Sequence, residues 1–375
     1  MKIGFDAKRA VQNNTGLGNY SRYMVEILSG LDLHHSYILF APKKKENAQL
    51  AKIRLRPSVS FIFPTKLLSK ILPSFWRMFW IKSDLKKEKI DIYHGLSNEL
   101  PVGIRKTGVK SIVTIHDLIF LRYPHYYKPV DRFIYRLKFQ HACRRADKIV
   151  AISECTKRDI ISFFNIPEEK IQVIYQGCHP VFHEKVTSER KHAVADKYGL
   201  PPHFLLYVGS IEPRKNLLLA VKALRLVSPE IHLVAIGKWT PYQATVEEFA
   251  SSHGLSARLH IFNGITFEEL PAFYALSKIF VYPSIFEGFG IPIVEALSQG
   301  IPVIATTGSC LEEAGGPSSI YVDPFDEKAL ADHIADLWNN PKRIAEMSLA
   351  GKEFVRNFDE RAIAQELIAL YISTL

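Results

Sequence analysis

Residues 279–303 read IFVYPSIFEGFGIPIVEALSQGIPV, and this stretch decides the fold class. Its first apolar run predicts a buried strand over 279–283, and Pro292 is suited to the first turn of a helix. Gly300, followed by Pro302, is typical of a helix end, and the next apolar run predicts another strand. The stretch therefore predicts a strand, a glycine loop, a short helix and a strand, which is the repeating unit of a parallel α/β sheet.

Similar short apolar runs recur along the chain, with longer helical patterns between them. In the first half they predict strands near 2–6, 36–41, 59–63, 90–94, 111–116, 147–152 and 171–175. In the second half they predict strands near 204–209, 231–236, 259–262, 279–283 and 302–305. We therefore expect an α/β protein in which each half forms a parallel sheet covered by helices.

The length of 375 residues is too great for one ordinary core and suits two domains. A polar stretch over 183–203 predicts a linker between them. We therefore expect an N-terminal domain over 1–185 and a C-terminal domain over 186–358. The last helical pattern, 359–375, is expected to form a helix that packs on either domain, the first included.

The composition excludes a disordered or fibrous chain, because 47% of the residues are hydrophobic and 23% are charged. No window holds the 18 or so uninterrupted apolar residues of a spanning helix, and Asp6 interrupts the start before a signal-peptide core forms. The four cysteines form no paired spacing. We therefore expect a cytoplasmic protein with reduced thiols.

The two halves differ in charge. Residues 1–190 hold 33 Lys and Arg against 17 Asp and Glu, a net charge of +16, whereas residues 191–375 hold 15 against 21, a net charge of −6. Such a basic half indicates an anionic partner, which could be nucleic acid, phospholipid or a phosphorylated acceptor.

The glycine loop of the opening stretch has the features of an anion site. Gly288 and Gly290 allow close approach of the backbone to a ligand, and the open amides at a helix start favour phosphate. Glu287 and Glu295 lie on either side of these glycines, so their carboxylates could accept hydrogen bonds from sugar and ribose hydroxyls. The simpler alternative is a glycine-rich turn whose glutamate interacts favourably with the helix dipole.

Arg214 and Lys215 are two adjacent cations between a predicted strand, which ends at Gly209, and a predicted helix. Positive charge at a helix start is locally unfavourable by about 0.3–1 kcal/mol, so the pair suggests a bound anion. Together the two side chains could neutralise a pyrophosphate and stabilise it as a leaving group. A solvated pair on a loop is the alternative.

His116 ends a buried strand, and in open α/β sheets ligands collect at the carboxyl ends of strands. A structural histidine is the simpler interpretation. The loop over 14–21 contains Gly16 and Gly18 and precedes a predicted helix, so it is a candidate flexible loop facing phosphate. It is a poor dinucleotide fingerprint, because Ser21 occupies the third glycine position. A plain surface turn is nearly as good an interpretation.

Residues 66–89 (KLLSKILPSFWRMFWIKSDLKKEK) combine seven Lys or Arg with bulky apolar side chains. This pattern is typical of a helix lying in the plane of a membrane surface, and Pro73 would divide it. The candidate membrane or acceptor contacts are Lys70, Trp76, Arg77 and Trp80. The alternative is a helix whose aromatic residues pack on the first sheet.

We expect no bound metal, since the chain has no Asp-x-Asp pair and no His/Cys/carboxylate cluster with metal-ligand spacing. A phosphate-binding P-loop and a G-x-S-x-G nucleophile elbow are missing as well.

Taken together, these motifs resemble those of the retaining glycosyltransferases of family four, over nearly the whole chain. The most specific element is the pattern of a glutamate, seven residues and a glutamate at Glu287 and Glu295, followed by the Arg214-Lys215 pair. The resemblance implies the GT-B architecture, in which two Rossmann-like, doubly wound domains face each other across a cleft. One departure is the turn Gln176-Gly177-Cys178-His179, where the family often has an Asn-Gly-Val-Asp-like sequence.

The resemblance also implies roles for individual residues. Arg214 and Lys215 would bind the donor's diphosphate, Glu295 the ribose hydroxyls and Glu287 the hydroxyls of the donor sugar. His116 would touch the transferred sugar near the reacting carbon. The resemblance implies further donor contacts in four places. Gly16 and Gly18 lie in the mobile loop, Gly209 at the strand end, and Gly264 and Ile265 in a loop where the family often contacts the base. The fourth place is the backbone around Glu287, at Gly288, Phe289, Gly290 and Ile291.

By this resemblance the protein is a metal-independent hexosyltransferase that retains the anomeric configuration. The segment 114–127 is most similar to branches that transfer mannose in surface-polysaccharide synthesis. The implied donor is GDP-mannose, with UDP-sugars as the alternative, and the implied acceptor is a glycan or a lipid-linked glycan. No other cofactor and no nucleic acid are expected, and the enzyme would lie at the inner face of the cell membrane. Two alternatives remain: a sugar-nucleotide epimerase or hydrolase of the same fold, and a non-enzymatic polyanion-binding protein.

Overall fold

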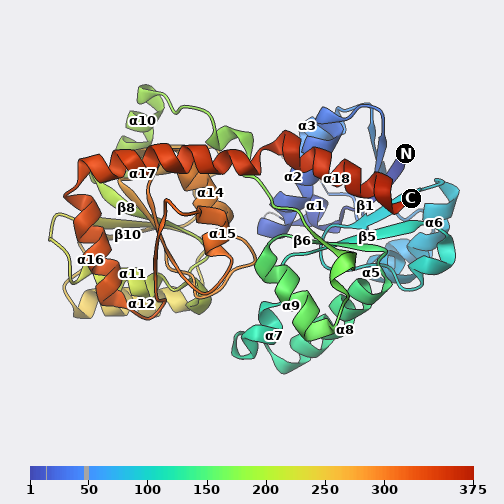
Figure 1. The fold of residues 1–375 in the computed structure, drawn as a ribbon, viewed down its shortest axis with the longest axis horizontal. Helices are drawn as coiled ribbons and strands as arrows, with labels where there is room; N and C mark the ends of the chain where they lie inside the picture. The colour runs from blue at the N-terminus through green and yellow to red at the C-terminus, as the bar shows by residue number, and fades with distance from the viewer. Residues whose placement is uncertain (14, 46–49) are drawn as a thin grey trace. The chain divides into compact units, whose positions relative to one another are not determined.

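The computed structural model describes residues 1–13, 15–45 and 50–375. These residues form two compact units (Figure 1). The first unit comprises residues 1–176 and 359–375, and the second comprises residues 177–358. The division thus falls slightly before the expected boundary at 185, and the C-terminal segment belongs to the first unit.

The first unit is built on a seven-stranded parallel sheet with the strand order β3-β2-β1-β4-β5-β6-β7. The order reverses direction between β1 and β4, so this is a doubly wound sheet. Its strands are β1 (Lys2–Asp6), β2 (Ser36–Phe40), β3 (Val59–Ile62), β4 (Ile92–Gly95), β5 (Lys110–Ile115), β6 (Lys148–Ala151) and β7 (Ile171–Val173).

The helices of the first unit cover this sheet. Helix α18 packs against α2, and Tyr371 of α18 lies 2.8 Å from Nδ1 of the buried His94 on β4. The helices are α1 (Lys8–Gln12), α2 (Gly16–Leu31), α3 (Ala51–Arg54), α4 (Leu67–Ile71), α5 (Pro73–Phe75), α6 (Ile81–Lys87), α7 (Ile119–Arg122), α8 (Pro129–Arg145), α9 (Glu154–Phe164) and α18 (Glu360–Thr374), with a π-helical turn over Trp76–Trp80.

The second unit repeats this plan with a six-stranded parallel sheet in the order β10-β9-β8-β11-β12-β13. Here the direction reverses between β8 and β11. The strands are β8 (Phe204–Val208), β9 (His232–Ile236), β10 (Leu259–Phe262), β11 (Ile279–Tyr282), β12 (Val303–Thr306) and β13 (Ile320–Val322). The helices are α10 (Ser188–Tyr198), α11 (Leu217–Leu224), α12 (Tyr242–Ser252), α13 (Leu270–Leu276), α14 (Ile291–Ser298), α15 (Leu311–Gly315), α16 (Glu327–Trp338) and α17 (Pro341–Phe354).

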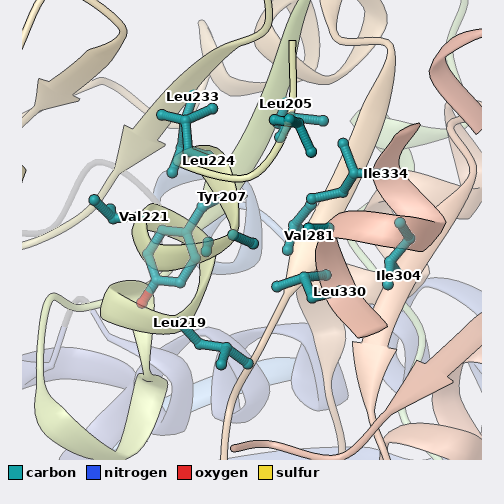
Figure 2. Packing of buried hydrophobic residues seen from close by; sticks show 14 of the residues in the cluster. Leu205, Tyr207, Leu219, Val221, Leu224, Leu233, Val281, Ile304, Leu330 and Ile334 are labelled. Carbon is teal, nitrogen blue, oxygen red and sulfur yellow. The ribbon is translucent and has the colours of Figure 1, made fainter. Parts of the chain in front are cut away.

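The core of the second unit explains why its strands have near-continuous apolar sequences. Side chains from β8, β9, β11 and β12 pack against α11 and α16 (Figure 2). A parallel sheet covered by helices on both faces buries both sides of each strand, so no polar alternation is possible. The labelled members of this cluster are Leu205, Tyr207, Leu219, Val221, Leu224, Leu233, Val281, Ile304, Leu330 and Ile334.

The expected α/β class with two doubly wound sheets is confirmed, and every strand predicted from the sequence is present. Strand β13 was not predicted, because its three residues are too few for a clear apolar run. Helix α10 replaces most of the linker expected over 183–203. The side chain of Thr187 accepts a hydrogen bond from the backbone N–H of Arg190 at its start, and Gly199 with φ of +58° ends it, so local capping overrides the polar composition.

No helix among the described residues is both long enough and apolar enough to cross a membrane.

Candidate donor and acceptor sites

The point of strand reversal in the second sheet brings the two main motifs together. The loop after β8 carries Arg214 and Lys215, and the loop after the neighbouring strand β11 carries Glu287. In open α/β sheets ligands bind outside the carboxyl ends of the strands at such a reversal. The two motifs are about seventy residues apart in the sequence and adjacent in the fold.

Glu287 forms ion pairs with both cations. Its Oε1 lies 2.6 Å from Nζ of Lys215, and its Oε2 lies 3.1 Å from a guanidinium nitrogen of Arg214. The hydroxyl of Tyr282 accepts a hydrogen bond of 2.9 Å from Lys215. Burial opposes ionisation of Glu287, but Lys215 and then Arg214 outweigh it and lower the pKa of this carboxyl to about 2. Glu287 is therefore a fixed anion and orients both cations.

The ion pairs with Glu287 change the interpretation of the two cations that rested on positive charge at a helix start. The two cations next to a helix start do not need a bound anion, because the chain supplies Glu287, and Arg214 also pairs with Glu212 at 2.8 Å. Among the described residues, Lys215 donates only to Glu287 and Tyr282, and an ammonium group has three N–H donors. One donor of Lys215 is thus left for a ligand.

Glu295 has a different environment, although it belongs to the same sequence pattern. It lies buried on α14, and its Oε2 accepts a hydrogen bond of 2.7 Å from the hydroxyl of Tyr274 on α13. Burial raises the pKa of Glu295 to about 7, while the bond from Tyr274 opposes the rise. Glu295 therefore changes its charge near neutral pH.

We expect Glu295→Gln to raise the melting temperature at pH 8 and to change it little at pH 5. The folded protein holds the proton of Glu295 more tightly than the unfolded chain, whose glutamate has an ordinary pKa of 4.5. Stability therefore falls as the pH rises from 4.5 through 7, and an uncharged glutamine avoids this loss. Thermal melts at both pH values measure the effect. Glu248→Gln on the exposed side of α12 is the matched control, and an equal gain at both pH values would contradict the assignment.

Three glycine loops lie next to one another at the carboxyl edge of β8, β9 and β10. The N–H of Gly209 donates to the carbonyl of Ile236, and the side chain of Asn263 donates to the carbonyl of Gly237 at 2.7 Å. A Cβ on Gly237 would lie 1.9 Å from the carbonyl oxygen of Gly209, so only glycine fits there. Gly264, with φ of +81°, and Ile265 continue this row.

The glycine loop before α14 is in contact with the buried side chain of Cys310. Gly290 has φ of +127°, which favours glycine, and it caps α14, whose first residue is Ile291. The thiol of Cys310 lies 3.0 Å from the carbonyl oxygens of Glu287 and Phe289. Phe289 is buried, whereas Gly288 is partly exposed.

In the first unit, His116 follows β5 directly and is buried. Its Nε2 lies 2.9 Å from the carbonyl oxygen of Leu96, and its backbone N–H donates to the side chain of Asn98 at 2.8 Å. Burial lowers the pKa of His116 to about 4, so the ring is neutral at pH 7. A carbonyl oxygen only accepts, so Nε2 carries the proton and Nδ1 is left as an acceptor. The ring of Tyr20 packs edge-on against it at 4.5 Å.

The expected loop around Gly16 and Gly18 is wrong. Both glycines belong to the first turn of α2, which begins at Gly16. A Cβ on Gly18 would lie 1.9 Å from the carbonyl oxygen of Asn13, so this glycine allows α2 to pack closely on the end of α1. Residue 14 of the expected loop lies outside the described residues.

The expected membrane segment divides into exposed and buried positions. Lys70 is exposed and Trp80 is partly exposed, but Trp76 and Arg77 are buried, which corrects the expectation for these two side chains. The indole N–H of Trp76 donates to Asp84 at 2.7 Å. Arg77 donates to Asp6 at 2.9 and 3.0 Å and also pairs with Glu99. Arg77 therefore ties the segment to β1, and Trp76 packs in the core cluster of the first unit.

Sequence reasoning missed three residues of the second-unit site. Tyr282 ends β11, and Gly237 follows β9 as Gly209 follows β8, so their places at strand ends were detectable signals. Tyr274 had no such signal, because it is one of several apolar positions in a buried helix. No group of three or more His, Cys, Asp and Glu side chains suited to a metal ion occurs within residues 1–13, 15–45 and 50–375.

Comparison with known proteins agrees with these motifs. Residues 16–181 match the family described as "Glycosyltransferase Family 4", and residues 190–354 match the family described as "Glycosyl transferases group 1". The chain is 28% identical over 350 residues to O-antigen chain mannosyltransferase B of Escherichia coli, covering 89% of this chain and 90% of that protein.

It is also 31% identical over 287 residues to the serotype-specific mannosyltransferase WbdA of E. coli, covering 74% of this chain and 34% of that protein. This chain therefore matches about a third of WbdA. In fold it is similar to sucrose-phosphate synthase of Thermosynechococcus elongatus, with a TM-score of 0.80, 21% identity, and coverage of 100% of this chain and 98% of the other.

Proposed function

Because the chain belongs to the family 4, group 1 glycosyltransferases, we propose that it transfers mannose from a nucleotide-sugar donor to a growing surface polysaccharide or lipid-linked glycan. The observation that carries the proposal is the pairing of Glu287 with Lys215 and Arg214 at the strand reversal of the second sheet. The mannosyltransferase names of the relatives that match the chain support the choice of sugar. These relatives do not favour an epimerase, a hydrolase or a polyanion-binding protein.

The favoured donor is GDP-mannose, with a UDP-sugar as the alternative, and the proposed reaction retains the anomeric configuration. The bond from the anomeric carbon to the phosphate oxygen breaks, and its electron pair stays on the leaving diphosphate. The acceptor oxygen bonds to the same face of that carbon, and its proton passes to the leaving phosphate. Glu287 is a poor nucleophile for a two-step route, because both of its oxygens pair with cations and its pKa is about 2.

In this proposal, each candidate residue of the two units has a stated role. Lys215 and Arg214 stabilise the charge of the leaving diphosphate, so that no metal ion is needed. Glu295 in its ionised form accepts hydrogen bonds from the ribose, and His116 accepts one from substrate through Nδ1. The glycine loops at Gly209, Gly264 and Ile265, and the backbone of Gly288, Phe289, Gly290 and Ile291, contact the nucleotide and sugar.

The test is incorporation of labelled mannose from GDP-mannose into lipid-extractable glycan, with the corresponding UDP-sugars in parallel and EDTA present throughout. We expect incorporation from one donor, full activity in EDTA, and an α-linked product by NMR. A folded protein that is stabilised by no nucleoside diphosphate, and that transfers no sugar, would overturn the proposal.

We further propose that the enzyme works at the cytoplasmic face of a membrane with anionic lipids. Two segments of the first unit support this. Helix α8 exposes an apolar face at i, i+3, i+4 and i+7 spacing, and α4 and α5 also expose apolar side chains. Glu99 pairs with Arg77 and with Lys138 of α8, which holds the two segments near each other. The exposed side chains are Leu67, Leu68, Ile71, Leu72, Phe75, Val130, Phe133, Ile134 and Leu137.

We expect Ile71→Ser with Phe133→Ser to lower partitioning onto vesicles containing phosphatidylglycerol by at least about tenfold, since each side chain contributes roughly 1.5–3 kcal/mol when buried. Vesicle sedimentation measures this. Leu349→Ser, at a position 75% exposed on α17, is the matched control and should change nothing. Equal partitioning of the double variant and the wild type would refute the membrane contact.

A further inference from the structure

A cavity of about 500 Å³ adjoins α4, and its lining includes Leu68, one of the exposed apolar side chains of that helix. It is formed by α4, the π-helical turn and α6, in the part of the first unit where Figure 1 labels α5 and α6. Its lining residues are Thr65, Lys66, Leu68, Ser69, Trp76, Phe79, Trp80, Lys82, Ser83 and Asp84. A volume of this size suits one small ligand.

The lining divides into apolar and cationic parts. Leu68, Trp76, Phe79 and Trp80 supply apolar and aromatic surface, which suits a hydrocarbon chain. Lys66 and Lys82 supply two ammonium groups, and neither forms an ion pair with a described residue.

The rest of the lining consists of side chains with hydroxyl groups and one carboxylate. Thr65 and Ser69 add hydroxyl donors to the lining, whereas the hydroxyl of Ser83 already donates to the carbonyl of Trp80 at 2.9 Å. The carboxylate of Asp84 already accepts the indole N–H of Trp76 at 2.7 Å, so it is committed to the wall of the cavity. The net charge of the lining is therefore positive, and an anion is the complementary headgroup.

The segment is also tied to the sheet. Arg77, within the π-helical turn, donates to Asp6 at the carboxyl end of β1. The backbone N–H of Val102 donates to the carbonyl of Met78 in the same turn at 2.8 Å. π-Helical turns are rare and frequently occur at functional sites. One wall of the cavity is thus bonded to the sheet, and Leu68 belongs both to its lining and to the exposed apolar side chains named above.

We propose that this cavity binds one phosphate-bearing amphiphile, with the phosphate held by Lys66 and Lys82 and the hydrocarbon chain lying against Phe79 and Trp80. Two sources share this chemistry: a phospholipid of the membrane surface, and the lipid phosphate that carries the acceptor glycan. The second source rests on the proposed function, whereas the binding chemistry itself does not.

Binding of short-chain alkyl phosphates below their micelle concentrations tests the site, measured by calorimetry on the full chain. From butyl to octyl phosphate we expect the affinity to rise about fourfold per CH₂ group, because each buried CH₂ contributes roughly 0.8 kcal/mol. Inorganic phosphate and the neutral octyl glucoside should bind far more weakly than octyl phosphate. If octyl glucoside binds as tightly as octyl phosphate, the site is a sugar or detergent site and the proposal is wrong.

Charge reversal locates the binding. Lys66→Glu with Lys82→Glu should weaken octyl phosphate about ten- to hundredfold, in line with the loss of charge-assisted hydrogen bonds. Lys86→Glu with Lys87→Glu is the matched control, because these exposed lysines lie on α6 but do not line the cavity. An equal loss in both double variants would mean nonspecific attraction and would overturn the proposal. Unchanged stabilisation by nucleoside diphosphates would show that both variants are folded.

Two further ligands separate the sources. If dihexanoyl phosphatidylglycerol binds more tightly than geranyl diphosphate, the natural ligand is a membrane phospholipid. If geranyl diphosphate binds more tightly, the natural ligand is the acceptor lipid. Binding of neither, or of both only in the charge-reversed variant, would overturn the proposal. These measurements need no sugar transfer. The binding proposal can therefore be refuted while the transferase assay succeeds. Conversely, the transferase assay can fail while the cavity binds octyl phosphate.

Discussion

Lys215→Ala is expected to lower kcat by about 10²-fold or more, in line with the usual loss for one transition-state contact. The variant removes the ammonium group that we assign to the leaving diphosphate. It also leaves Glu287 with Arg214 as its only cationic partner. The pKa of Glu287 should consequently rise from about 2, because Lys215 is the larger of the two cationic influences on it.

The measurement is steady-state transfer of labelled sugar at saturating donor, together with a melting curve. Lys222→Ala is the matched control, because Lys222 is a lysine of the same unit whose partner Glu327, on α16, is partly exposed. We expect the control to stay within about twofold of the wild type. Turnover of Lys215→Ala near the wild-type value, in folded protein, would show that the leaving group is stabilised elsewhere.

Arg77→Ala is expected to lower the free energy of unfolding of the first unit by about 3–5 kcal/mol. Arg77 is buried, and its guanidinium is the cation shared by Asp6 and Glu99. Removing it leaves the carboxylate of Asp6, which is 1% exposed, without a compensating charge. Glu99 keeps Lys138 at 3.2 Å, so Asp6 accounts for most of the loss.

Urea unfolding measures this loss through the fluorescence of Trp76 and Trp80, in a background where Trp239 and Trp338 of the second unit are replaced by Phe. Adding Asp6→Asn to Arg77→Ala should recover part of the stability, because the uncompensated charge is then absent. Lys86→Ala, an exposed lysine on α6, is the control and should change the midpoint little. A loss under about 1 kcal/mol for Arg77→Ala would contradict the buried ion-pair network.

Most of the fold could be predicted because its signals are local. Long apolar runs such as 204–209 and 279–283 are sufficient to identify strands that are buried on both faces. Where local signals conflicted, the prediction failed. The polar residues of α10 predict a linker, although Thr187 and Gly199 cap a helix. The glycines of α2 predict a loop, because a glycine at a helix start has the same sequence signal as one in a turn.

The candidate site was predicted in its residue types but not in its pairing. Glu287, Glu295, Arg214 and Lys215 were identified by motif. Only the adjacency of β8 and β11 in the sheet shows that Glu287 compensates the charge of the two cations. For the same reason, the sequence could not distinguish the strongly ionised Glu287 from Glu295, whose pKa is about 7.

By itself, the sequence determined the α/β class, the two sheets, the positions of twelve of their strands and the main candidate site residues, because these depend on apolar runs and on motifs of neighbouring residues. The tertiary structure alone decided which side chains are buried, which charges compensate one another and which face of the 66–89 segment is exposed. Burial and the strength of a charge interaction depend on what lies within a few ångströms in space. Those neighbours, such as Asp6 for Arg77 and Tyr274 for Glu295, are distant in the chain.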